Sequence, residues 1–131
     1  VISTAGRIPN AAAPYLMYAY ARIRSILRRV EGLLPERAAI ILQDPAERAL
    51  GLELLNYDQI VHEVSESLEP HRLCGYLFEL ATKFAVFYQQ CPVLRPESEE
   101  LRLSRLMMCR FTARVLAHHL GLLGINAPEF M

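Results

Sequence analysis

The sequence predicts an all-α protein, a helical bundle of about five helices. Apolar residues recur at 3.6-residue spacing along much of the chain, most clearly in the stretch PYLMYAYARIRSILRRV from Pro14 to Val30. No segment shows the convincing alternation of apolar and polar residues that is typical of strands. With 131 residues, of which 53% are hydrophobic, the chain has the size of one domain and enough apolar material for a core.

The first expected helix begins at Pro14, after a lead-in of residues 1–13, and ends near Gly32. Proline suits the first turn because its missing N–H group would have no partner there, and glycine is favoured just after a helix end. Residues 33–43 are expected to form a loop or a short helical turn. The core stripe of this first helix consists of Leu16, Tyr20, Ile23, Leu27 and Val30.

Four more helices follow from local signals. Asp44 is a candidate N-cap with Pro45 at the first helical position, and a second acidic segment runs from Tyr57 to Leu68. Pro70 begins a helix that reaches about Cys91, with an inner stripe of Leu73, Leu77, Leu80, Phe84 and Phe87. After a proline-containing loop, Ser98 caps a long helix that reaches Leu123. Because apolar residues lie on two sides of this last helix, it should be central to the bundle.

Charge is unevenly distributed although the net charge is zero. Residues 1–37 carry six basic and two acidic groups, whereas residues 38–70 carry one basic and seven acidic groups. A basic patch at one end can therefore attract polyanions while the whole chain stays neutral. The three widely spaced cysteines indicate reduced thiols in a cytoplasmic protein, and no stretch has the ~18 uncharged apolar residues of a membrane span.

Motifs for catalysis and metal binding are missing. The sequence contains no phosphate-binding glycine loop, no G-x-S-x-G and no H-E-x-x-H. His118 and His119 are adjacent on a helix, so their side chains point about 100° apart and make a poor chelating pair. Cys91 has no base suggested nearby, and a buried or loop thiol is the simpler interpretation. Catalytic and metal-ligating residues are therefore expected to be absent.

The first helix carries a second face that combines flat rings with guanidinium groups, formed by Tyr15, Tyr18, Arg22, Ser25 and Arg29. Arginine binds phosphate bidentately and stacks on bases, and tyrosine rings stack on unpaired bases. The periodicity leaves two interpretations open: a platform for RNA, or a solvated basic helix whose tyrosines complete the edge of the core. Composition alone favours the solvated helix, because basic helices are common and weakly specific. A third face contains Met17, Ala21, Arg24 and Arg28.

An ordered set of motifs resembles the anticodon-binding domain of arginyl-tRNA synthetases, the C-terminal all-helical domain known as DALR. The most specific motifs are PHRLCGYLFELA, from Pro70 to Ala81, and GINAPEFM, from Gly124 to Met131. PYLMYAYARIRSIL, ERALGLELLNY and LRLSRLMMCRFTARVLAHHL also match in order. The resemblance extends from about Ala13 to the last residue.

The resemblance implies a tRNA-binding site at five positions of this chain. In the family, the aromatic residues of a Y-L-x-Y segment and the arginine four residues later lie near the anticodon stem-loop, and here these are Tyr15, Tyr18 and Arg22. A tyrosine before the loop that joins the last two long helices corresponds to Tyr88, and a terminal methionine corresponds to Met131. The loop from Cys91 to Pro96 corresponds to a segment that moves when tRNA binds.

Several features depart from the family pattern or lie outside this chain. Phe130 stands where the family usually has arginine, Pro92 lies where some members have tryptophan, and the H-I-G-H and K-M-S-K-S motifs of class I synthetases are absent. The resemblance implies that those motifs belong to an upstream catalytic domain of the same chain, which uses ATP and Mg²⁺, whereas this domain needs no cofactor. The expected partners are arginine tRNA and that catalytic domain, with no membrane.

The sequence also allows a different function, a helical protein-interaction module without an RNA role. In that hypothesis the acidic segment from Asp44 to Glu69 is the partner face, and the tyrosines and arginines of the first helix are incidental.

Overall fold

The computed structural model describes residues 12–30, 36–67, 70–93 and 96–122, and all five helices that it contains there are α-helices. Their bounds are α1 Ala12–Arg28, α2 Pro45–Leu55, α3 Tyr57–Ser67, α4 Pro70–Gln90 and α5 Glu99–Leu122. No strand occurs in these described segments. The predicted all-α class and the prediction of about five helices are confirmed.

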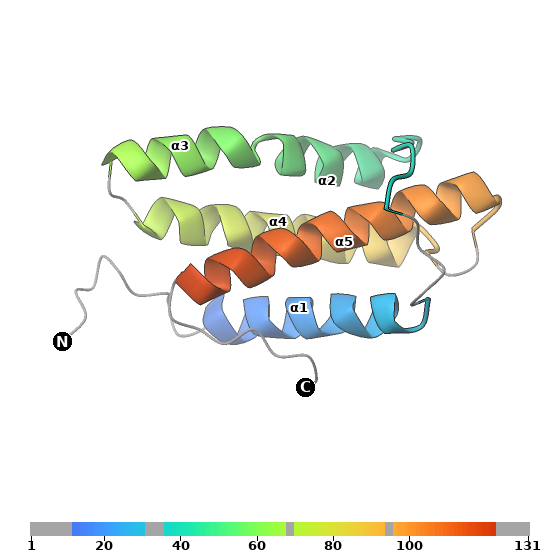
Figure 1. The fold of residues 1–131 in the computed structure, drawn as a ribbon, viewed down its shortest axis with the longest axis horizontal. Coiled ribbons are helices and arrows are strands. Elements are labelled where there is room, and N and C mark those ends of the chain that lie inside the picture. Colours follow the sequence, from blue (N-terminus) through green and yellow to red (C-terminus); the bar gives the residue numbers. More distant parts are fainter. Residues whose placement is uncertain (1–11, 31–35, 68–69, 94–95, 123–131) are drawn as a thin grey trace.

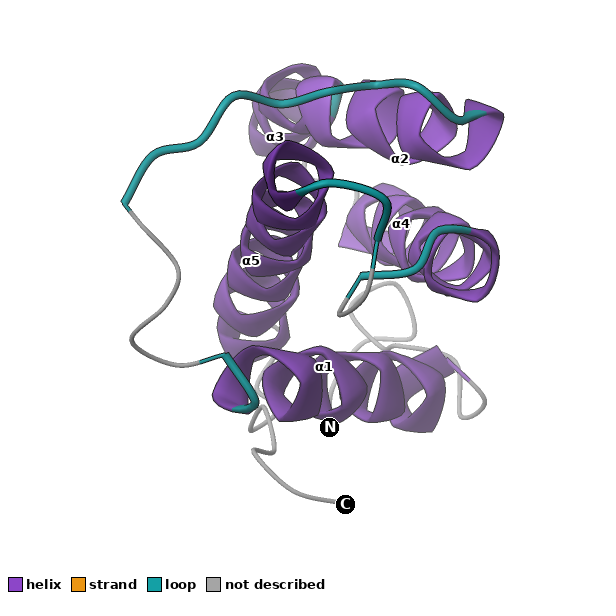
Figure 2. Ribbon diagram, turned by 90° about the vertical axis from the view of Figure 1, so that its right-hand side faces the viewer, coloured by secondary structure: helices purple, strands orange, loops and turns teal. Residues whose placement is uncertain are grey.

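The helices form three layers (Figures 1 and 2). α4 and α5 make the middle layer, with α1 on one side and the nearly continuous pair α2 and α3 on the other. α1 contacts α4 and α5, and it contacts neither α2 nor α3. The expectation that the last long helix is central is confirmed, and α4 shares that position.

Local signals explain where the helices begin. α1 begins at Ala12, two residues before the expected position, which leaves Pro14 in its first turn. The Asp44 side chain accepts a hydrogen bond from the Ala46 N–H at 2.9 Å, with Pro45 at the first helical position as predicted. Ser98 caps α5, because its Oγ accepts from the Leu101 N–H at 3.2 Å. The expected end signal of the first helix, Gly32, lies outside the described residues.

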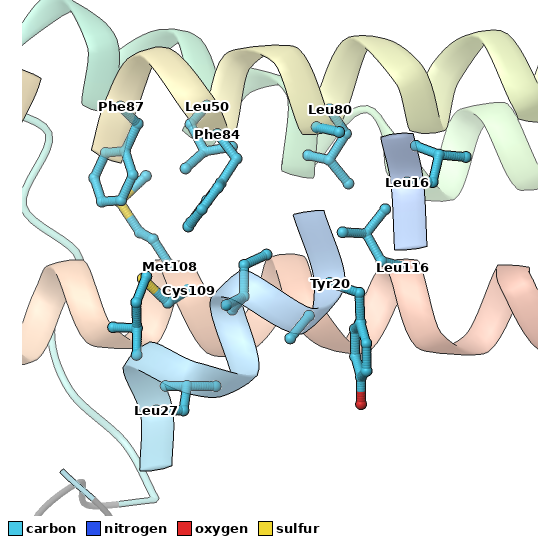
Figure 3. Close-up of a cluster of buried hydrophobic side chains, with 14 of the residues drawn as sticks. Leu16, Tyr20, Leu27, Leu50, Leu80, Phe84, Phe87, Met108, Cys109 and Leu116 are labelled. Atoms are coloured by element: carbon cyan, nitrogen blue, oxygen red, sulfur yellow. The ribbon is translucent and has the colours of Figure 1, made fainter. Parts of the chain in front are cut away.

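The core fills the space between α1, α4 and α5 and extends to α2 (Figure 3). Leu16, Phe87, Leu106 and Leu116 have no exposed surface, and every residue of the two predicted core stripes is buried. Ala21, on the third face of α1, is buried as well, with 6% of its surface exposed. Because α1 packs on α4 and α5 together, its buried arc is wider than a single stripe.

A buried hydroxyl attaches the segment before α2 to α5. Ser104 has no exposed surface, and its Oγ accepts a hydrogen bond from the Ile41 N–H at 2.7 Å. We expect Ser104→Ala to lower the free energy of unfolding by about 1–3 kcal/mol, because the Ile41 N–H loses its acceptor. Urea denaturation measures this change. Ser25→Ala, on a partly exposed side of α1, is the control and should shift stability by less than about 0.5 kcal/mol. Equal effects of both exchanges would contradict the assignment.

Candidate nucleic-acid interface

The predicted RNA-binding residues of α1 and α4 lie where these two helices pack on each other. Tyr15, Tyr18 and Arg22 recur every three to four residues, which places them along one side of α1. Tyr88 lies in the last turn of α4. Figure 2 shows α4 and α5 on the same side of α1, with α4 lying beside α5 in the middle layer. The fold therefore brings the four described positions of the predicted site to one pair of helices.

Arg22 and Tyr88 form the closest contact within this set. The guanidinium carbon of Arg22 lies 4.8 Å from the centroid of the Tyr88 ring, a cation–π distance. Tyr88 in turn stacks on the buried Phe84 ring, with centroids 6.2 Å apart and planes at 11°. Because Phe84 supports the Tyr88 ring from the core, the exposed guanidinium of Arg22 is held over a fixed aromatic surface.

Tyr15 and Tyr18 have different environments. Tyr15 is half-buried, and its hydroxyl lies 3.4 Å from Thr82 Oγ1 on α4. Tyr18 is 60% exposed, so its ring is available to a ligand. Tyr15 therefore helps to pack α1 against α4, whereas the exposed ring of Tyr18 contributes little to the packing of the fold.

The structure adds an aromatic residue that the sequence-based site did not include. Phe78 on α4 is 42% exposed, and its ring centroid lies 4.9 Å from that of Tyr15. A signal for it was present in the sequence, since Phe78 directly follows the core residue Leu77 and therefore points about 100° away from the inner stripe. The fifth predicted residue, Met131, lies outside the described residues.

The charge of this face is basic on α1. The helix contains no acidic residue, Arg22 on it is exposed, and Arg29, directly after its last residue, is exposed as well. Lys83 on α4 does not add to this charge, because its ammonium group pairs at 2.6 Å with the carboxylate of Glu53 on α2, in the layer on the other side of α4. Protein surfaces that bind single-stranded nucleic acids combine basic groups with exposed aromatic rings.

The other reactive side chains are arranged for packing rather than chemistry. Within the described segments, no three His, Cys, Asp or Glu side chains gather to hold a metal ion. The thiol of Cys91 has no exposed surface, and burial raises its pKa to about 11, which keeps it protonated and poorly nucleophilic. No helix among the described residues is long and apolar enough to cross a lipid bilayer.

A separate apolar groove of about 530 Å³ lies between α2, α5 and the segment that precedes α2. Arg114 is the only charged residue that lines this groove among the described residues, and the other lining residues include Leu42, Leu55 and Phe111. Among the described residues of the segment from Asp44 to Glu69, no acidic side chain lines it. The groove uses neither α1 nor α4, so it is distinct from the predicted RNA-binding face.

Comparison with known proteins decides the family. Residues 16–131 match the DALR anticodon binding domain family. The chain belongs to this family. The DALR domain is 50% identical over 120 residues to an arginine–tRNA ligase of Thermobifida fusca and 51% identical over 124 residues to one of Rippkaea orientalis. These matches cover 90% and 91% of the chain, and 21% of each relative.

Comparison with solved structures supports the same family. The fold superimposes on arginyl-tRNA synthetase of Thermus thermophilus with a TM-score of 0.74 at 39% identity, over 90% of this chain and 21% of that one. The Plasmodium falciparum arginyl-tRNA synthetase gives a TM-score of 0.76 at 31% identity, again over 90% and 21%. The DALR domain thus spans about one-fifth of the length of the proteins that it matches.

Proposed function

We propose that the face formed by α1 and α4 binds the anticodon stem-loop of arginine tRNA, and that the chain acts as the anticodon-binding part of an arginine–tRNA ligase. The observation that carries the proposal is Arg22 held over the Tyr88 ring, beside the exposed Tyr18. Membership of the DALR family and the similarity to arginine–tRNA ligases support it.

The binding mechanism follows from these side chains. Unpaired anticodon bases leave their own stack and are received by tyrosine rings, each such stack contributing about 1–3 kcal/mol. The guanidinium of Arg22 neutralises a phosphate or stacks beside a base, which makes the affinity dependent on salt. Since the Tyr88 ring is already supported by Phe84, little ordering is needed when the RNA binds.

In the complete enzyme, anticodon binding would orient the acceptor end of the tRNA toward an upstream catalytic domain of the same polypeptide. That domain would use ATP and Mg²⁺ to arginylate the tRNA, whereas the DALR domain would supply tRNA affinity without a cofactor. We place this activity in protein biosynthesis in the cytoplasm. The chain carries neither H-I-G-H nor K-M-S-K-S, so we assign it no catalytic step.

Titration with a fluorescein-labelled anticodon stem-loop of arginine tRNA, at several salt concentrations, tests this proposal. We expect Tyr88→Ala and Arg22→Ala to weaken binding by about 5- to 150-fold and about 5- to 10-fold, because they remove a stacking ring and a cation. If Arg22 contacts a phosphate, its loss should reduce the salt slope by about 1. Arg114→Gln, which removes one positive charge from the α2–α5 groove, is the matched control and should bind nearly as the parent chain does.

Two results would contradict the proposal. The unaltered chain could fail to bind the stem-loop at any salt concentration, which would favour a protein-interaction module. Alternatively, Tyr88→Ala and Arg22→Ala could leave the KM for tRNA unchanged in a full-length ligase that carries this domain. Circular dichroism of each variant would establish that the helices are intact.

A further inference from the structure

A second pair of rings lies on the α1–α4 face, away from the contact between Arg22 and Tyr88. It consists of Tyr15 and Phe78, whose centroids are 4.9 Å apart with planes tilted by 36°. The Phe78 ring is 42% exposed, although its neighbours Leu77 and Leu80 on α4 have no exposed surface. An isolated exposed apolar side chain is common in soluble proteins and needs no functional explanation.

Two observations distinguish Phe78 from an isolated exposed ring. Its position is supported, because the Tyr15 ring lies against it and the Tyr15 hydroxyl lies 3.4 Å from Thr82 Oγ1, one turn further along α4. Tyr18 on α1 is also exposed. The α1–α4 face therefore carries an exposed ring on each helix, Tyr18 on α1 and Phe78 on α4.

The spacing of the two ring pairs fits a single strand of RNA. Phe78 and Tyr88 are ten residues apart in one helix, which corresponds to about 15 Å along its axis. Tyr15 and Arg22 are seven residues apart in α1, about 10 Å along that axis. At a stacked rise of ~3.4 Å per nucleotide, 10–15 Å is covered by about three to four nucleotides. Both ring pairs are thus within reach of one hairpin loop.

We propose that Tyr15 and Phe78 form a second stacking site, which receives one unpaired base while Tyr88 and Arg22 receive another base of the same loop. This proposal rests on the proposed function. It assigns one unpaired base of the hairpin loop to the end of the α1–α4 face where Tyr15 and Phe78 lie. Phe78 offers a ring without a hydrogen-bonding group, so it contributes affinity and sets the register of the loop without reading base identity. Arg22, in contrast, can donate hydrogen bonds to a base edge or a phosphate.

The experiment combines Phe78 variants with stem-loops that carry 2-aminopurine at one loop position at a time. Phe78→Ala should weaken binding by about 5- to 150-fold, the range expected for the loss of one base stack. Phe78→Tyr keeps a ring and should bind within about twofold of the parent chain, whereas Phe78→Leu keeps apolar bulk without a ring and should bind poorly. One loop position should lose its fluorescence quenching in Phe78→Ala and keep it in Tyr88→Ala, and another position should show the reverse.

Phe111→Ala is the matched control, because Phe111 is also an exposed phenylalanine, at 37%, but lines the α2–α5 groove. It should leave RNA binding unchanged. If Phe78→Ala binds as tightly as the parent chain while Tyr88→Ala binds weakly, the second stacking site is wrong and the proposed function stands. If Phe78→Leu binds as well as Phe78→Tyr, the ring is not stacking and the proposal fails. Absence of RNA binding by the unaltered chain overturns both.

Discussion

Glu47→Ala should lower the free energy of unfolding by about 3–5 kcal/mol, as expected when one partner of a buried ion pair is removed. Glu47 has no exposed surface, and its Oε2 accepts a hydrogen bond from Arg105 Nε at 3.0 Å. Its Oε1 accepts from the backbone N–H of Asp44 at 2.8 Å and from that of Gln43 at 3.2 Å. The alanine would leave the guanidinium of Arg105, a residue that is 7% exposed, without its carboxylate.

The loss should extend to the segment that follows α4. Arg105 Nη1 donates to the Pro92 carbonyl at 2.8 Å, so one side chain connects the start of α2, the middle layer and the residues after α4. We therefore expect Glu47→Ala to increase amide exchange of Cys91 and Val93 as well as around α2. Both residues are buried in the native structure.

Urea denaturation of Glu47→Ala and Glu99→Ala measures the effect against a matched control. Glu99 also pairs with an arginine, Arg102 at 2.8 Å, but its side chain is 67% exposed. An exposed pair contributes at most about 1 kcal/mol, so Glu99→Ala should be nearly neutral. The double exchange Glu47→Leu with Arg105→Met should recover part of the loss, because no buried charge is left unpaired. Similar free energies of unfolding for Glu47→Ala and Glu99→Ala would show that the buried Glu47 carboxylate does not stabilise the fold.

Acidification from pH 7 to pH 4 should remove about 3 kcal/mol of stability through His119 alone. Burial lowers the pKa of His119 from 6.5 to about 4, and the neighbouring His118 adds to this shift. The ring is 2% exposed, and its Nε2 shares a 2.6 Å hydrogen bond with the Tyr57 hydroxyl. Its Nδ1 has no hydrogen-bond partner among the described residues, so a proton added there would be buried without an acceptor.

The direction in which stability changes with pH follows from the number of protons that the folded and the unfolded chain bind. Between pH 6.5 and pH 4 the unfolded chain carries a protonated His119 while the folded chain keeps it neutral, so stability rises with pH in this window. Well below pH 4 both states are protonated, and His119 contributes no further change. Tyr57 does not titrate in this range, because burial raises its pKa above 10.

Urea denaturation at pH 4, 5, 6 and 7 checks this expectation. His119→Gln should flatten the dependence of stability on pH between 4 and 6.5, even if it is less stable at pH 7. His118→Gln is the control, since the adjacent ring is exposed and should leave most of the dependence in place. A parent chain that is equally stable at pH 4 and pH 7 would contradict the assignment.

The sequence by itself determined the helices and the residues of their inner stripes. The 3.6-residue period of Leu16 to Val30, the N-cap at Asp44 and the cap at Ser98 are interactions within a few residues, so they can be read without knowledge of the packing. Family motifs in the sequence also selected Tyr15, Tyr18, Arg22 and Tyr88. Their role in RNA binding stays a prediction, and the titrations above test it.

The tertiary structure decided which of these side chains meet. Arg22 lies over Tyr88, and Tyr15 lies against Phe78, because α1 packs beside α4. Glu47 and Arg105 are 58 residues apart, and Tyr57 and His119 are 62 apart, so no local pattern marks them as partners. From the sequence, Glu47 is an ordinary acidic residue in the first turn of a helix, and His119 is half of an adjacent histidine pair. The packing of α2 and α3 against the middle layer buries both residues, and this burial gives each its expected effect on stability.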